Sequence, residues 1–91
     1  MRNRNNKELI ELVVVFKKEV SGEDAKRIIA NLSYPSHEGA DSSRGKHYFY
    51  MTGPKYIIEI PQSENERIGK RISDIPEVYE VYKADWNIQK D

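Results

Sequence analysis

The chain has 91 residues, in which 15 Lys and Arg balance 15 Asp and Glu, and it contains no cysteine. This length fits one small domain with one hydrophobic core. Zero net charge gives no long-range attraction to nucleic acid, and the sequence has no apolar stretch of the roughly 20 residues that crosses a bilayer. Without cysteine there is no disulfide, thiolate metal site or cysteine nucleophile. We therefore expect a cytoplasmic protein that does not bind membranes, and the charge balance disfavours nucleic acid as its partner.

The first strong pattern is the apolar segment from Leu9 to Phe16, whose β-branched residues are typical of a strand in the middle of a sheet. Ser21 follows in a position to cap a helix, and the acids at 23 and 24 complement the dipole of its first turn. One apolar face at helical spacing is formed by Ala25, Ile28, Ile29 and Leu32.

The next segment, 33–46, is rich in Ser, Gly, Pro and Asp, which predicts a long loop and a secondary candidate contact region. Two strands are expected after it, at His47 to Met51 and at Lys55 to Ile60. The Gly53-Pro54 pair between them is a turn signal, so the short connection predicts an antiparallel hairpin.

The last third of the chain predicts a helix and a strand. Ser63 and Glu66 have the spacing of a capping box, after Pro61 has stopped the third strand. Residues 78–84 have the pattern of a fourth strand. The inner face of the second helix is expected to carry Ile68, Ile72 and Ile75.

These elements predict an α+β fold of the ferredoxin-like βαββαβ type, a sandwich of one four-stranded antiparallel sheet and two helices on one face. Right-handed crossovers place both helices on the same face and leave the other face open. The domain is expected to span residues 9–85. Residues 1–8 are predicted to be a disordered basic tail, and residues 86–91 a short C-terminal tail.

The open face of the predicted sheet is rich in tyrosine. Strand alternation sends Tyr48 and Tyr50 to this face and Phe49 to the other, and Tyr56, Tyr79 or Tyr82 are candidates to join them. Tyrosine suits a surface that a protein partner half buries. Cross-strand packing on a solvated face explains the same residues without any partner, so both interpretations stay open.

Motifs for catalysis and for cofactors are missing. His37 lies near Asp41, Ser42 and Ser43, but residues so close on one loop lack the fixed geometry of a hydrolytic triad. Neither histidine has zinc-ligand spacing, and no phosphate-binding glycine loop is present. We expect no enzyme activity, no metal and no cofactor. Weak RNA binding remains an alternative because residues 44–51 begin like an RNA-recognition motif, although they lack its first and last aromatic positions.

The chain resembles the subtilisin propeptides and the small protease inhibitors related to them. The resemblance is carried by the segments Val13 to Lys17, Ser21 to Ala25 and Ile75 to Val81. It implies an inhibitor or propeptide-like chaperone whose partner is a subtilisin-like serine protease. In that family the open sheet face packs on the enzyme and the C-terminal tail lies in the substrate cleft.

The resemblance also implies which residues would contact the protease. Those on the open face would be Tyr48, Tyr50, Glu59 and Glu80, and those in the cleft Asn87, Ile88, Gln89, Lys90 and Asp91. A carboxylate on the sheet is suited to cap the N-terminus of a protease helix. The competing interpretation is a regulatory or self-association domain similar to ACT domains, in which edge strands pair between copies. We expect a monomer or a weak homodimer.

Overall fold

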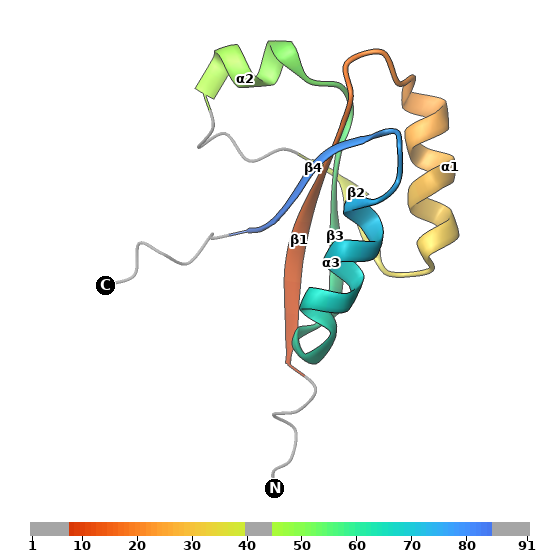
Figure 1. Cartoon of the computed structure of the whole chain (residues 1–91), viewed down its shortest axis with the longest axis vertical. Coiled ribbons are helices and arrows are strands. Elements are labelled where there is room, and N and C mark those ends of the chain that lie inside the picture. The colour runs from red at the N-terminus through yellow and green to blue at the C-terminus, as the bar shows by residue number, and fades with distance from the viewer. Residues whose placement is uncertain (1–7, 40–44, 85–91) are drawn as a thin grey trace, which may run out of the picture.

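The computed structural model describes residues 8–39 and 45–84. Its sheet has four antiparallel strands in the order β2-β3-β1-β4, which is the predicted α+β, βαββαβ arrangement and is consistent with a ferredoxin-like topology (Figure 1). The elements in chain order are β1 (Leu9–Phe16), α1 (Gly22–Leu32), β2 (Ser36–Glu38), α2 (Gly45–Met51), β3 (Lys55–Pro61), the 3-10 turn η3 (Gln62–Glu64), α3 (Asn65–Ser73) and β4 (Val78–Lys83).

Strand β1 lies between β3 and β4, as its nearly unbroken apolar run predicts. Its side chains alternate between the two faces of the sheet, and both sets are buried. One set packs in the main core with α1 and α3, and the other forms a smaller cluster with Ile57 of β3. The first set is Leu12, Val14 and Phe16, and the second is Val13 and Val15.

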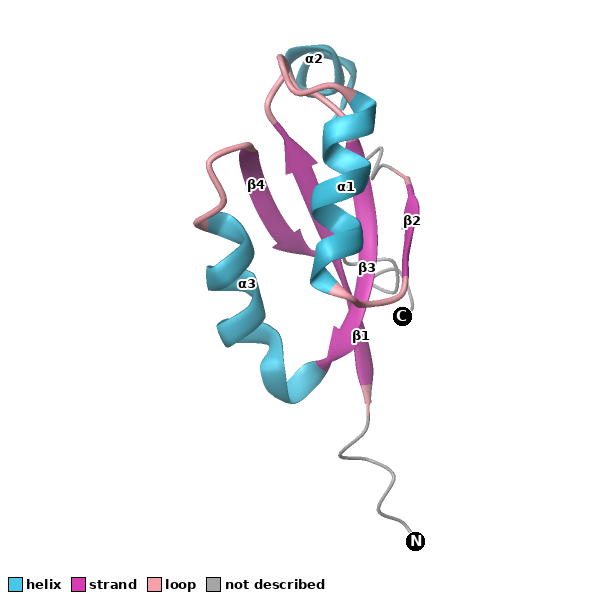
Figure 2. Cartoon of the chain, turned by 90° about the vertical axis from the view of Figure 1, so that its right-hand side faces the viewer, coloured by secondary structure: helices cyan, strands magenta, loops and turns pink. Residues whose placement is uncertain are grey.

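Helices α1 and α3 cover one face of the sheet, whereas α2 lies on the opposite side near one end (Figures 1 and 2). The predicted apolar positions face the main core, although Ile75, predicted on the second helix, lies beyond the end of α3 at Ser73. Ala25 and Ile29 of α1 and Ile68 and Ile72 of α3 are buried there. Within the described ranges, no helix is long and apolar enough to cross a membrane.

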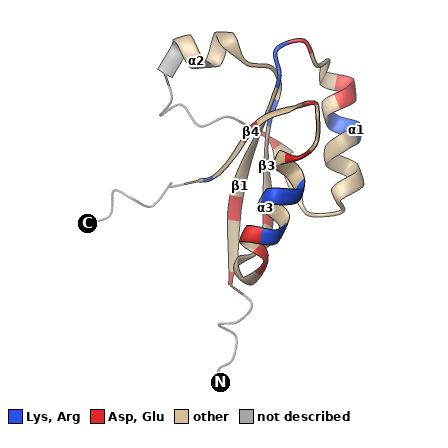
Figure 3. Cartoon of the chain, viewed as in Figure 1, with Lys and Arg blue, Asp and Glu red and all other residues tan. Residues whose placement is uncertain are grey.

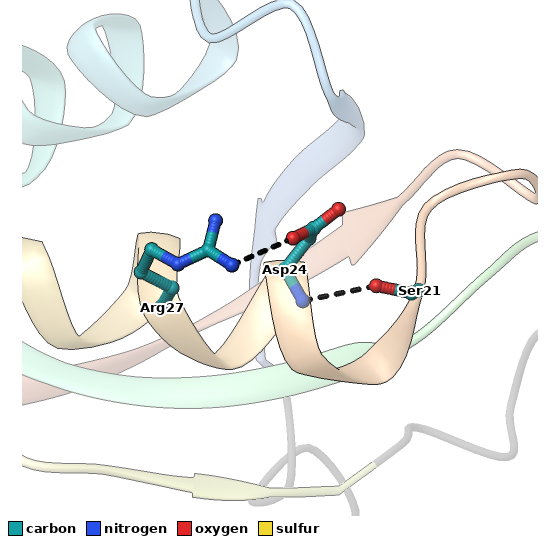
Figure 4. A network of polar contacts seen from close by, with 3 residues as sticks. All are labelled: Ser21, Asp24 and Arg27. Carbon is teal, nitrogen blue, oxygen red and sulfur yellow. Dashed lines mark hydrogen bonds and ion pairs between the residues drawn. The ribbon is translucent and has the colours of Figure 1, made fainter.

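The predicted cap of α1 is confirmed. The Ser21 Oγ accepts a hydrogen bond of 3.1 Å from the backbone N–H of Asp24, and the Asp24 carboxylate accepts one of 2.9 Å from Arg27 (Figure 4). A cap of this kind contributes about 1 kcal/mol. The exposed ion pair contributes less, because water screens both charges.

The capping box predicted for the second helix is wrong. Ser63 lies inside η3, and α3 begins at Asn65 with no side-chain hydrogen bond at its cap. A capping box needs the Ser backbone in extended conformation at the helix entry, and the turn after Pro61 prevents this. Glu66 still lies in the first turn of α3, where a carboxylate complements the helix dipole.

The prediction for the second strand is also wrong. Residues 47–51 belong to the helix α2, and the second strand is Ser36–Glu38, within the segment predicted as a loop. Accordingly, Gly53 and Pro54 connect a helix to β3 and do not form a hairpin turn. The Pro35 carbonyl accepts a hydrogen bond from Glu59 N–H immediately after α1, so the chain pairs with the edge of β3 before it reaches residue 47. Strand propensity in 47–51 is overridden because the place beside β3 is already occupied.

The turn from α1 to β2 depends on Ser33, which has φ 65° and ψ 30°. Apart from glycine, it is the one residue with positive φ in the described part of the chain. Its N–H donates to the Ala30 carbonyl at 3.2 Å, as at a helix C-terminus where glycine is preferred. The left-handed conformation is unfavourable for a residue with a Cβ atom.

We predict that Ser33→Gly raises the free energy of unfolding by about 0.5–1 kcal/mol, because glycine relieves the left-handed strain. The matched control is Ser73→Gly at the last residue of α3, which lowers it by a similar amount because glycine is unfavourable in a helix. Urea denaturation followed by circular dichroism measures both changes. A loss of stability in Ser33→Gly would contradict the strain argument.

Candidate protein-binding site

Four of the nine residues predicted to bind protein lie in the described part of the chain. Tyr48 and Tyr50 are on α2, Glu59 is on β3 and Glu80 is on β4. The prediction that strand alternation sets the two tyrosines side by side is wrong, because they belong to a helix. The other five, at 87–91, lie outside the described residues, as do the predicted N-terminal tail up to residue 7 and the candidate residues 41–43.

The face of the sheet opposite α1 and α3, here called the outer face, carries both predicted glutamates. In the strand register Glu80 lies opposite Val15, and Glu59 lies opposite Glu11. Val15 belongs to the small buried cluster of this face, against which Tyr48, Tyr82 and Ala84 pack. The outer face is therefore partly covered by a side chain of α2.

Tyr48 and Glu80, which are far apart in sequence, meet on the outer face. The Tyr48 hydroxyl donates a hydrogen bond of 2.5 Å to the Glu80 carboxylate, and the two groups are partly buried. The Tyr48 ring also contacts the Tyr79 ring edge to face, with 6.2 Å between centroids. A hydrogen bond to a charged acceptor contributes about 1.5–3 kcal/mol, so this pair fastens α2 to β4.

The C-terminal end of α2 is held against β1. Buried Thr52 donates its hydroxyl to the Tyr48 carbonyl at 2.9 Å. Gly53 N–H then donates to the Phe16 carbonyl at 2.8 Å, and Phe16 N–H donates to the Pro54 carbonyl at 2.9 Å. The helix is thus fixed both by the Tyr48 side chain and by the backbone that follows it.

Helix α2 exposes three large apolar side chains in succession. Phe49 is 50% exposed, Tyr50 72% and Met51 53%, and Tyr79 on neighbouring β4 is 54% exposed. The ring of Tyr48, also on α2, contacts the ring of Tyr79. We call Tyr48, Phe49, Tyr50, Met51 and Tyr79 the aromatic surface.

A single cation borders the aromatic surface in the contacts that the structure describes. The Lys55 ammonium lies 4.3 Å from the centre of the Phe49 ring and donates a hydrogen bond of 2.7 Å to the Gly53 carbonyl. Burial lowers the pKa of Lys55. Residues 47–51 contain no Lys, Arg, Asp or Glu, whereas α1 and α3 carry both signs of charge (Figure 3).

The remaining tyrosine candidates of the predicted face divide between the two sides of the sheet. Tyr82 packs on the outer face, as predicted. Tyr56 is buried in the main core, where burial and then the negative charge of Glu38 raise its pKa. Sequence reasoning missed Phe49 and Met51, because alternation along a strand turns both side chains inward. When the segment is a helix, four consecutive large side chains at 48–51 instead indicate a functional surface.

Other chemistry is sparse in the residues described. His37 is exposed on β2, and residues 8–39 and 45–84 contain no group of three or more His, Cys, Asp or Glu that could hold a metal ion. Comparison of the chain with protein-family models, with curated proteins and with solved structures found no match.

Gly53 holds the aromatic surface in place because the backbones touch there. A Cβ atom at this position would lie 2.1 Å from the Lys17 carbonyl oxygen, which is too close for any substitution without a backbone shift. We predict that Gly53→Ala lowers the free energy of unfolding by about 1–3 kcal/mol.

The control for this substitution is Gly69→Ala in α3, where a Cβ atom meets nothing within 4 Å. It raises the free energy of unfolding by about 0.5–1 kcal/mol, because alanine favours a helix over glycine. Thermal and urea unfolding of both variants measure the difference. Equal effects of the two alanines would show that the contact with Lys17 is unimportant.

Proposed function

We propose that this protein acts by binding a protein partner through its aromatic surface. The observation that carries the proposal is that α2 exposes Phe49, Tyr50 and Met51 while Tyr48 fixes the helix to the sheet. A group of exposed large apolar side chains on a small protein is typical of an interaction site. Tyrosine, phenylalanine and methionine are enriched in such sites.

The way in which α2 is held supports the proposal. A helix of seven residues is too short to be stable alone, so its order comes from its contacts with β1 and β4. Those contacts involve Tyr48 and the residues after Met51, and they leave the adjacent large side chains in water. A platform ordered before binding loses little conformational entropy when a partner docks.

The test is capture of partners from an extract of the source cells by tagged protein, with quantification by mass spectrometry. We expect Tyr50→Asp and Phe49→Asp to lower the amount of a specific partner at least tenfold, since aromatic contact residues carry much of the binding energy. Arg71→Asp on exposed α3 is the control and retains it. Identical sets of bound proteins for all variants would refute the proposal.

Inhibition of a subtilisin-like protease is the narrower form of this proposal. It is supported by the βαββαβ order and by the position of Glu59 and Glu80 on the face opposite α1 and α3. An enzyme that packs on this face would also meet α2, because Tyr48 lies against it. The aromatic surface would then form one side of the contact with the protease.

This narrower form predicts inhibition of subtilisin at micromolar protein concentration, measured by hydrolysis of a chromogenic peptide. Removal of residues 87–91 and the change Glu59→Gln should each raise the inhibition constant about tenfold, or about 1.4 kcal/mol. Glu66→Gln on α3 should leave it unchanged. If the intact protein does not inhibit, or the truncated one inhibits equally well, the protease is not the partner.

A further inference from the structure

A groove between α1 and β2 is a candidate ligand site on the helix-covered side of the sheet. Its volume is about 610 Å³, which is within the range of small-molecule sites. Residues of α1 and β2 form its two walls, and Tyr56 of β3, the neighbour of β2 in the sheet, lies at its floor (Figure 2). None of the five residues of the aromatic surface lines it, so a ligand here goes beyond the proposed partner binding.

The Tyr56 hydroxyl has no hydrogen-bond partner in the described part of the chain. The residue is only 8% exposed, and its ring contacts the Phe16 ring edge to face, with 6.4 Å between centroids. No hydrogen bond of the described residues involves its hydroxyl, whereas the hydroxyls of Thr52 and Tyr48 both have partners. Buried polar groups in proteins are nearly always paired. A buried hydroxyl at the floor of a groove therefore indicates a ligand that supplies the partner.

The charge that acts on this hydroxyl is negative. Ser36 and Glu38 lie opposite Ile58 and Tyr56 of the main core, so their side chains project on the helix-covered side, and that of His37 projects on the other. Burial and then the Glu38 carboxylate raise the pKa of Tyr56, and among the described residues no cation acts in the opposite direction. The hydroxyl keeps its proton, and Glu38 repels any anion placed beside it.

The other charges of the groove come from α1. Glu23 and Lys26 line it, so together with Glu38 the lining carries two carboxylates and one ammonium. Within the described residues, none of these three side chains forms a salt bridge. Asp24 and Arg27 of the same helix pair with each other and lie outside the lining (Figure 4). The groove is acidic on balance, and its carboxylates are available to a cationic ligand.

We propose that this groove binds a guanidinium group, carried either by a small molecule or by an arginine side chain. The planar N–H donors of a guanidinium form a fork that bonds the Glu38 carboxylate and the Tyr56 hydroxyl together, which the compact ammonium group does less well. Glu23 supplies the second negative charge from α1. The carbon chain of the ligand packs on Ile29, which is buried in the core and lines the groove.

Three probes with the same carbon chain test the chemistry: butylguanidine, butylamine and butyrate. Titration of the full chain, followed by ¹H–¹⁵N NMR, should give saturable shifts at Glu23 and Glu38 with a dissociation constant of about 1 mM or lower for butylguanidine. Butylamine should bind about fivefold more weakly, and butyrate should not shift these amides. No saturation with butylguanidine by about 10 mM, or equal binding of butyrate, would overturn the proposal.

Removal of the hydroxyl separates a ligand role from a structural one. Tyr56→Phe keeps the ring and should weaken butylguanidine binding about tenfold, because the ligand loses a hydrogen bond. The same variant should unfold in urea with no loss of stability, since the hydroxyl has no partner in the described chain. Lower stability of Tyr56→Phe would show that the hydroxyl is bonded within the chain, and unchanged affinity would show that the ligand does not reach it. Either result would overturn the proposal.

Charge variants test the sign of the ligand. Glu38→Gln should weaken butylguanidine binding about tenfold, and Lys26→Met should strengthen it about threefold because a repelling cation is removed. Glu66→Gln on α3 is the control and should leave binding unchanged. Tyr50→Asp, which disrupts the aromatic surface, should also leave it unchanged, so the groove and the partner site are tested separately. Weaker binding in Lys26→Met would indicate an anionic ligand and overturn the proposal.

A peptide distinguishes the two sources of the guanidinium group. A blocked pentapeptide with one central arginine among alanines is titrated beside butylguanidine, and its lysine counterpart is the control. Tighter binding of the arginine peptide supports an arginine side chain of a protein as the natural ligand, whereas tighter binding of butylguanidine supports a small molecule. Equal binding of the arginine and lysine peptides at this groove would contradict recognition of the guanidinium fork.

Discussion

Strand β1 is apolar on both of its faces, and the rest of the described fold is arranged to cover it. On one face Ala25 and Ile29 of α1 and Ile68 and Ile72 of α3 are buried in one core with the inward side chains of β1. On the other face Val13 and Val15 are buried with Ile57, and Tyr48, Tyr82 and Ala84 pack against them. Burial of each such side chain contributes about 1.5–3 kcal/mol, so the sheet gains from cover on both sides.

This requirement connects the core to the candidate site. A sheet with one fully solvated face needs no third helix, but Val13 and Val15 make water on the outer face unfavourable. The Tyr48 ring packs against these valines, and its hydroxyl donates a hydrogen bond to the Glu80 carboxylate. The residues that follow Tyr48 on α2 remain in solvent, so the aromatic surface results from the way in which the outer face is covered.

The parts of the fold that the sequence predicts are those in which local pattern and burial agree. Leu9 to Phe16 is both β-branched and central, and α1 has a cap, an acidic first turn and an apolar face that point to one structure. Residues 47–51 show the opposite case, because their aromatic composition favours a strand while the edge of β3 is filled by 36–38. Nothing local in Ser36-His37-Glu38 indicates a strand, since its order comes from the hydrogen bonds of its neighbours to β3.

Part of the candidate site was predictable, because it lies on strands in which local pattern and burial agree. Glu59 and Glu80 are assigned to the open face by the resemblance to subtilisin propeptides, and the register of β3 and β4 puts both on the outer face. The sequence predicts Tyr48 on a strand, whereas its side chain contacts the outer face from a helix. Phe49 and Met51 could not be assigned to the surface, because which side of a segment is exposed depends on whether it is a helix or a strand.

The pairing of the first strand with the last sets the order in which this chain can fold. Phe16 lies opposite Val78, so one long side of β1 has no backbone partner until β4 has been synthesised. Contacts between segments so distant in sequence carry a large loop-closure cost and slow folding. During translation, β1 therefore leaves the ribosome before β3 and β4, its two neighbours in the sheet, which makes Val13 to Val15 the stretch that a chaperone or an aggregate would contact.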